Sequence, residues 1–221
     1  MNKYKLFIII CFFVISSFLP KVNATIKGYN LSGKIICLDS GHGGIDTGAK
    51  NKTIIEKNIN LILTKELEKE LISRGATVYL TRDGDYDLST SSSSRKRSDL
   101  YNRAKLINDI DPDLYISLHL NSTTNSKWRG LQVFYTNKNE SNILLAEEIT
   151  NYLKSKMSNV RDKKQNNTYL MYNNIKSPGV LIEAGFISNP DDNYLLRNKD
   201  YQKKLVVLIS DAIENYFKNN K

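Results

Sequence analysis

The stretch ICLDSGHGGIDTGA, residues 36–49, joins the pattern of a buried strand to a glycine-rich turn. It continues the run KIICLD (34–39), whose apolar centre is typical of a strand covered on both faces. The run ends at Asp39, and three glycines then surround His42, one of only two histidines in the chain. A tight turn needs glycine but has no need of histidine. The stretch therefore predicts a central strand with a functional side chain directly after it.

Strand-like and helix-like segments alternate along the rest of the chain. Further apolar runs predict strands at residues 77–80, 114–119, 131–135 and 179–184. Apolar residues at helical spacing predict helices from Ile55 to Leu71 ahead of Gly75, over 99–110, over 140–155, and from Tyr201 to Tyr216. This alternation predicts a single α/β domain, a three-layer sandwich with a mostly parallel central sheet flanked by helices.

Two polar segments interrupt this pattern. The run STSSSSRKRS (89–98) is too polar to pack and predicts a mobile surface loop, and SNVRDKKQNN (158–167) predicts a loop that rims a site. The sequence contains no evident internal repeat, second domain or nucleic-acid motif.

The first residues resemble an export segment. A short basic start precedes an apolar run at residues 6–19, which is short for the roughly 20 residues of a membrane span. Val22 and Ala24 have the small-residue spacing of a signal-peptidase site. Residues 1–24 are therefore expected to be a secretory signal peptide, with an uncleaved membrane anchor as the alternative. The protein is therefore expected to act outside the cytoplasm.

Removal of residues 1–24 would lower the net charge from +9 to +6, because it takes away three lysines and no acid. It would also leave Cys37 as the only cysteine, so that no internal disulfide can form. The positive charge suits a polyanionic surface such as a cell wall, but without clustering it favours an ordinary solvated lysine-rich face.

Reactive side chains lie at the ends of three predicted strands. The first strand leads to His42, the third ends on His119, and the fifth carries Glu183 within VLIEAGF. The carboxyl ends of parallel strands share one edge of a sheet, where binding sites form. These side chains are therefore expected to meet at one edge, and Glu56, at the start of the first predicted helix, is expected there too.

Taken singly, most of these residues have a structural explanation. A histidine near a strand end is often only a hydrogen-bonded rim residue. Glu56 completes a capping-box pattern with Thr53. Glu183 differs, because an ionised carboxylate in so apolar a strand is costly unless it is paired or has a task. The glycines around His42 lack the Gly-Lys-Ser/Thr ending of a nucleotide-binding loop.

Taken together, two imidazoles and a carboxylate at one edge are a donor set typical of zinc, with a fourth position left for water. A second carboxylate beside such a site suits hydrolysis. Zinc lowers the pKa of its bound water to about 7, and a glutamate takes up the released proton. The glycines would let the loop bring His42 close to the metal.

At these residues, and over nearly all of 25–221, the chain resembles the zinc-dependent N-acetylmuramoyl-L-alanine amidases that cut bacterial peptidoglycan. LDSGHGGIDTGA looks like their opening metal motif, IIEKNINL like the segment with the glutamate ligand, and LYISLHLNS like the second histidine motif. SPGVLIEAGFISNPDD is similar to the segment with the catalytic glutamate, whereas VYLTRDGD and LYNRAKLIN resemble structural stretches. The resemblance implies that residues 25–221 form a Zn2+ amidase catalytic domain, in which His42, Glu56 and His119 bind zinc and Glu183 is the catalytic acid and base.

Neighbouring residues refine this expectation. Asp39 and Asn121 are candidates for orienting the ligands, or they only close the turns. Ser40 stands where the family usually has proline, and Leu120 where a smaller residue is common. Ser40 is expected to loosen the loop that holds His42 and so to weaken zinc binding.

The chain has no evident wall-binding module, and in this respect it resembles the minimal amidases of spore formers. These strip peptides from spore-cortex peptidoglycan, a step towards muramic δ-lactam in sporulation and germination. The alternatives are a vegetative autolysin or cell-separation amidase, a non-catalytic wall-binding protein of the same fold, and a zinc carboxypeptidase. The last would need a cation for the terminal carboxylate of its substrate, and Arg129 and Arg161 are loop candidates for that role.

The expected partners follow from the same resemblance. Peptidoglycan is the expected substrate, and a protein partner is expected to place or activate a domain that has no evident targeting module. No nucleic acid is expected to bind, and membrane contact is expected only through an uncleaved N-terminal segment.

Overall fold

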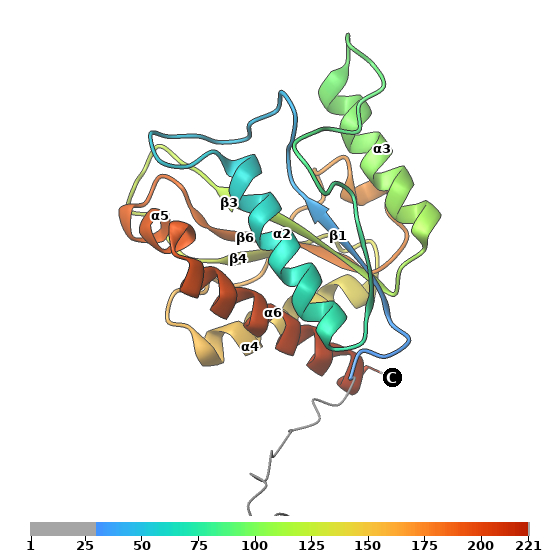
Figure 1. Cartoon of the computed structure of the whole chain (residues 1–221). Coiled ribbons are helices and arrows are strands. Elements are labelled where there is room, and N and C mark those ends of the chain that lie inside the picture. Colours follow the sequence, from blue (N-terminus) through green and yellow to red (C-terminus); the bar gives the residue numbers. More distant parts are fainter. Residues whose placement is uncertain (1–29, 221) are drawn as a thin grey trace, which may run out of the picture.

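Six strands form one sheet in the order β2-β1-β3-β6-β4-β5 (Figure 1). The structure is a computed structural model that describes residues 30–220, so the expected export segment at 1–24 lies outside the described part. The strands are β1 (Ile35–Ser40), β2 (Thr77–Leu80), β3 (Leu114–Asn121), β4 (Gln132–Tyr135), β5 (Lys164–Gln165) and β6 (Gly179–Phe186). Strand β1 pairs in parallel with β2 and β3, and β3 pairs in parallel with β6. Strand β4 pairs in parallel with β5, and among the described strands the β4–β6 pair is the one antiparallel pair of this sheet. The prediction of a mostly parallel sheet is therefore confirmed.

Helices cover both faces of this sheet. One face packs against α2 (Glu56–Ser73), α4 (Glu140–Lys156), α5 (Pro190–Arg197) and α6 (Lys199–Asn219). The other carries α3 (Arg95–Ile110) and the 3-10 helix η1 (Tyr172–Asn174), which contact each other. Figure 1 shows α2 and α6 side by side, with α3 apart from them. The predicted three-layer α/β sandwich is therefore confirmed. Within residues 30–220 no helix combines the length and the apolar character that crossing a bilayer requires.

Alternate residues of the central strands point to opposite faces of the sheet, and this alternation positions the site. Ile36 and Leu38 join the large core under α2, α4 and α6, whereas Cys37 joins the smaller core under α3. Tyr115 and Leu181 face the same smaller core. Further along these strands the smaller-core face becomes polar, because the next residues in its register are Asp39 in β1, Ser117 and His119 in β3, and Glu183 in β6.

The structure differs from the sequence prediction in several local elements. Helix α3 begins at Arg95, so the last part of the expected loop 89–98 is helical, while Ser89 and Ser91 hydrogen-bond to each other ahead of it. The segment 158–167 contributes β5 to the sheet. The sequence prediction also missed η1 and α5. A signal for α5 was present, because Asn189 caps the helix and Pro190 occupies its first turn.

Candidate active site

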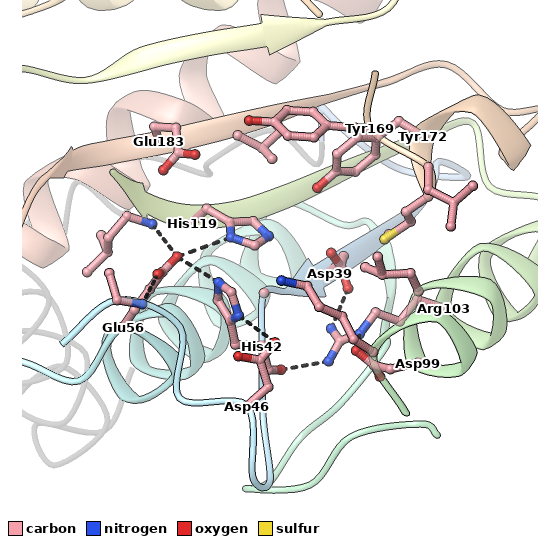
Figure 2. A pocket seen from close by; sticks show the side chains of 18 of the residues that line it. Asp39, His42, Asp46, Glu56, Asp99, Arg103, His119, Tyr169, Tyr172 and Glu183 are labelled. Atoms are coloured by element: carbon pink, nitrogen blue, oxygen red, sulfur yellow. Dashed lines mark hydrogen bonds and ion pairs between the residues drawn. The ribbon is translucent and has the colours of Figure 1, made fainter. Parts of the chain in front are cut away.

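The carboxyl ends of three strands and the start of α2 meet at one cavity (Figure 2). His42 follows β1, His119 lies in β3 and Glu183 lies in β6, where it is the register partner of His119. Glu56 is the first residue of α2. All four line a cavity of about 390 Å³, so the structure brings together every residue to which the sequence assigned a main role.

His42, Glu56 and His119 form a compact cluster of potential ligands. One ligand atom from each lies within 4.8 Å of the others. Oε1 of Glu56 is 3.1 Å from Nε2 of His42 and 3.1 Å from Nδ1 of His119. Two imidazoles and one carboxylate that converge in this way form a possible metal site, and this donor set fits an open zinc site with three protein ligands.

The carboxylate of Glu56 is fixed by the backbone around it. The backbone amide of Ala49 donates to Oε2 at 2.8 Å, and that of Leu120 donates to Oε1 at 3.0 Å. Burial raises the pKa of Glu56, but hydrogen bonds from His119 and His42 outweigh it and hold the pKa well below its usual range. Glu56 is therefore ionised in the folded protein.

The capping-box explanation of Glu56 is wrong. The residue directly ahead of α2 is Ile55, whose side chain makes no capping hydrogen bond. The backbone amide of Glu56 donates to the carbonyl of Ala49, while the backbone amide of Thr53 donates to the side chain of Asn51. The carboxylate is thus free to point into the cavity.

Asp46 orients His42, a role that the sequence analysis missed. Its Oδ2 lies 2.9 Å from Nδ1 of His42, which leaves Nε2 to face Glu56. The signal was the spacing of four residues within GHGGID. Burial lowers the pKa of His42, but the hydrogen bonds to Glu56 and Asp46 raise it overall. Burial raises the pKa of Asp46, but bonds from His42 and the amide of Gly48, with the charges of His42 and Lys96, lower it overall.

Two glycines make the approach of the ligands possible. A Cβ atom on Gly41 would lie 2.3 Å from Cε1 of His119. A Cβ atom on Gly48 would lie 2.5 Å from Oε2 of Glu56 and 2.6 Å from Cδ2 of His42. Gly48 also has a φ of +63°, which other residues adopt only at a cost. Glycine at both positions is therefore a steric requirement of the cluster.

Glu183 is buried beside the cluster, and its Oε2 has no hydrogen-bond partner within the described residues. Figure 2 shows its carboxylate pointing into the cavity from β6. Burial, with the negative charge of Glu56, raises the pKa of Glu183 to about 7 in spite of the two histidines. Because this pKa is raised, the folded state binds the proton more tightly, and ionisation of Glu183 destabilises the fold as pH rises from 4.5 towards 7. Glu183 can therefore exchange a proton near neutral pH.

Asp39 and Asn121 do not hydrogen-bond to the cluster. Asp39 accepts from Thr81, Ser117 and Arg103, all on the smaller-core face of the sheet. The side-chain oxygen of Asn121 accepts from the backbone amide of Ser122, so it closes its own turn. Asp39 lines the same cavity, and its partner Arg103 links it to the carbonyl of His42.

Two buried arginines hold the loop that carries His42, and the sequence analysis missed both. Arg82 donates to the carbonyls of Ser40 and Gly41 at 2.9 and 3.0 Å. Arg103 donates to the carbonyls of Ser40 and His42 at 2.7 and 2.6 Å. These arginines lie in the stretches VYLTRDGD and LYNRAKLIN, to which only a structural role had been assigned. They clamp three consecutive carbonyls.

The arginines proposed for a carboxypeptidase lie elsewhere. Arg129 forms an ion pair with Asp191 at 2.7 Å, and Arg161 lies over the ring of Trp128. Neither lines the cavity, and no residue of the segment 158–167 does so. The expectation that this segment rims the site is therefore wrong.

The mostly parallel α/β sheet, with a possible metal site beside a buried proton-exchanging carboxyl group, defines the catalytic domain of a hydrolase. The model of the N-acetylmuramoyl-L-alanine amidase family matches residues 36–215, more than half of the chain. The chain belongs to this family, and it is an N-acetylmuramoyl-L-alanine amidase.

Individual relatives agree with this assignment. A germination-specific N-acetylmuramoyl-L-alanine amidase of Bacillus subtilis (strain 168) is 42% identical over 193 residues, which cover 85% of this chain and 81% of that protein. The probable cell wall amidase LytH of Staphylococcus aureus is 35% identical over 190 residues, which cover 85% of this chain and 60% of LytH. The CwlD amidase from Clostridioides difficile, solved in complex with the GerS lipoprotein, matches with a TM-score of 0.80 and 34% identity. That match covers 85% of this chain and 100% of the CwlD chain.

Gly48→Ala is expected to lower amidase activity by roughly a hundredfold, because its Cβ would displace Glu56 and His42 from the cluster. The control is Gly33→Ala, since Gly33 has a φ of +78° but nothing within 4 Å of an added Cβ. Both substitutions should lower the melting temperature through a backbone cost of about 1–2 kcal/mol. Equal activity losses in the two variants would show that backbone strain, and not the clash at the cluster, is responsible.

Arg103→Met is expected to destabilise the fold by about 3–5 kcal/mol at pH 7, because it leaves the buried Asp39 without its counter-ion. Burial raises the pKa of Asp39, but Arg103 and the hydrogen bonds from Ser117 and Thr81 hold it below 3.8. In the native protein this lowered pKa gives stability that is present above pH 3.8 and is lost only at lower pH.

In Arg103→Met, burial dominates, so Asp39 favours its neutral form and the deficit in stability should narrow as pH falls towards 4. Urea unfolding of both proteins at pH 7 and pH 4 measures this. Arg103→Met with Asp39→Asn should recover part of the loss at pH 7. A deficit that is the same at both pH values would contradict the role of the ion pair.

Proposed function

We propose that this amidase uses zinc held by His42, Glu56 and His119, with Glu183 as the catalytic acid and base, to cut the bond between N-acetylmuramic acid and L-alanine in spore-cortex peptidoglycan. The observation that carries the proposal is the buried Oε2 of Glu183, which lacks a hydrogen-bond partner in the described part of the chain and faces the cavity of the three potential ligands. When bound, zinc would lower the pKa of a water molecule to about 7 and polarise the amide carbonyl.

The residues of the chain would orient the zinc ligands and transfer the proton. Asp46 holds the imidazole of His42 with Nε2 towards the cluster, and the amides of Ala49 and Leu120 hold Glu56. Glu183 would accept the proton of the attacking water on Oε2 and return it to the amine of the leaving L-alanine. A pKa of about 7 suits both steps, since the group must be a base first and an acid afterwards.

The substrate is supported by the relatives. The 42% identical relative is named a germination-specific amidase, which supports action on spore cortex during sporulation or germination. LytH is named a cell wall amidase, so a vegetative autolysin is the second candidate. Both names support a site of action outside the cytoplasm. The proposal includes an export segment at residues 1–24 and a catalytic domain at residues 25–221.

Glu183→Gln is expected to abolish turnover while zinc stays bound, because Gln keeps the shape of the side chain but cannot exchange the proton. His119→Ala is the comparison and should lose zinc and activity together. Residues 25–221 with added zinc are incubated with cortex and with vegetative peptidoglycan. Mass spectrometry then detects peptides with an L-alanine amino terminus, and metal analysis counts the bound zinc.

Release from cortex peptidoglycan by the unmodified protein alone is the expected result. Release only from vegetative wall would favour the autolysin. Turnover by Glu183→Gln, or loss of its zinc, would show that its role is misassigned.

We also propose that a lipoprotein partner places or activates this domain at a membrane surface. The support is the CwlD amidase, which was solved in complex with the GerS lipoprotein. A tagged 25–221 domain is expected to capture such a lipoprotein from detergent-solubilised native membranes, and to gain activity when the purified partner is added. Recovery of no protein, or a captured partner without effect on activity or zinc content, would contradict the proposal.

A further inference from the structure

Among the described residues that line the cavity, one cation forms no ion pair with an acidic side chain. Arg103 lines the cavity, but it is bound to Asp39 and Asp99 at 2.8 and 2.9 Å. Lys96 also lines the cavity, and among residues 30–220 it makes no ion pair and no hydrogen bond. Its charge contributes to the environment of Asp46, the residue that orients His42. The ammonium group of Lys96 is thus available to a ligand within the cavity of the proposed catalytic residues.

The stability of α3 does not explain this lysine. Arg95, Lys96 and Arg97 occupy the first turn of α3, which contains no acidic residue and has no side-chain cap. Cations are unfavourable at a helix N-terminus, where the backbone amides already carry partial positive charge. Arg95 is compensated by Asp87 at 2.9 Å, whereas Lys96 has no such partner among the described residues. A cation that costs helix stability and lines the active-site cavity is expected to have a use there.

The chemistry of the reaction indicates which part of the substrate carries the complementary charge. In N-acetylmuramoyl-L-alanine the carboxyl group of muramic acid is consumed in the amide bond, so the sugar side offers no carboxylate. Negative charge near the scissile bond must therefore come from the leaving peptide. A cavity of about 390 Å³ encloses only a small part of a polymeric substrate, so this carboxylate must lie within a residue or two of the bond.

We propose that Lys96 is a specificity-determining residue that binds a free carboxylate on the leaving peptide, on the residue directly after L-alanine. The amidase would then prefer stem peptides in which this carboxylate is ionised over those in which it is amidated. This inference rests on the proposed function, because it takes the cavity lined by Glu183 as the place where the amide is cut. A lysine is a point charge on a flexible stem, which suits an exposed mouth of the cavity.

The test measures binding separately from turnover. The probes are N-acetylmuramoyl-L-alanyl-D-isoglutamate and N-acetylmuramoyl-L-alanyl-D-isoglutamine, both with the γ-carboxyl group capped as its methylamide. The first then carries one ionised α-carboxylate and the second, the amide, is neutral. Their dissociation constants are measured by calorimetry on zinc-loaded Glu183→Gln protein, alone and combined with Lys96→Met, Lys96→Arg or Arg97→Met. Arg97→Met is the matched control, because it removes one charge from the same helical turn but from a residue that does not line the cavity. The kcat/KM ratio for the two probes is measured in parallel with the unmodified Glu183.

The acidic probe is expected to bind more tightly than the amide, and Lys96→Met should weaken its binding by roughly tenfold, the low end for a hydrogen bond to a charged group. The ratio of the two dissociation constants should then approach one, whereas Lys96→Arg and Arg97→Met should keep the preference for the acid. Equal weakening for both probes, an unchanged ratio, or the same effect from Arg97→Met would overturn the proposal. Tighter binding of the acidic probe by the unmodified protein, with cleavage of neither probe, would refute the proposed function but not the role of Lys96.

Discussion

Two buried guanidinium groups hold the backbone from which the site is built. The carbonyls of Ser40, Gly41 and His42 lie at the buried end of β1, and each of them accepts a hydrogen bond from Arg82 or Arg103. The carbonyl of Gly41 also accepts from the side chain of Asn60. Asp39 neutralises Arg103, whereas Arg82 donates to backbone carbonyls only, and burial together with the charge of Arg103 lowers its pKa to about 10. A network of this kind is rigid because each unmade bond would leave a buried group unsatisfied. It places His42 before any ligand is present.

The two glutamates of the site lie in opposite electrostatic environments. Burial raises the pKa of Glu56, but the imidazoles of His119 and His42 hold it below the usual range. Burial and the charge of Glu56 raise the pKa of Glu183 to about 7. Two carboxyl groups at one cavity thus differ in protonation near neutral pH. Such a separation assigns them different tasks, one as a permanent anion and the other as a proton carrier.

The sequence predicted most of the fold and the residues of the cluster, because both follow from local patterns. Apolar runs and helical spacing depend on neighbouring residues. The carboxyl ends of parallel strands lie at one edge of the sheet, whichever loops connect the strands. Arg82, Arg103 and Asp46 were missed for the opposite reason. Buried arginines resemble surface arginines in sequence, and their burial depends on carbonyls up to sixty-three positions away, as for Arg103 and Ser40. The capping box at Glu56 failed because a tertiary bond to Leu120 competes with the local motif.

The hydrogen bonds from Arg82 and Arg103 change the effect expected of serine at position 40. Serine in place of proline was expected to loosen the loop, since proline restricts the backbone. Ser40 is fully buried, and its carbonyl accepts from both arginines, so its backbone is held from outside. Its hydroxyl has no partner among the described residues, which is a cost that proline would not have. The position of His42 therefore depends on Arg82 and Arg103 more than on the stiffness of residue 40, and the loop tolerates serine for as long as both guanidinium groups stay in place.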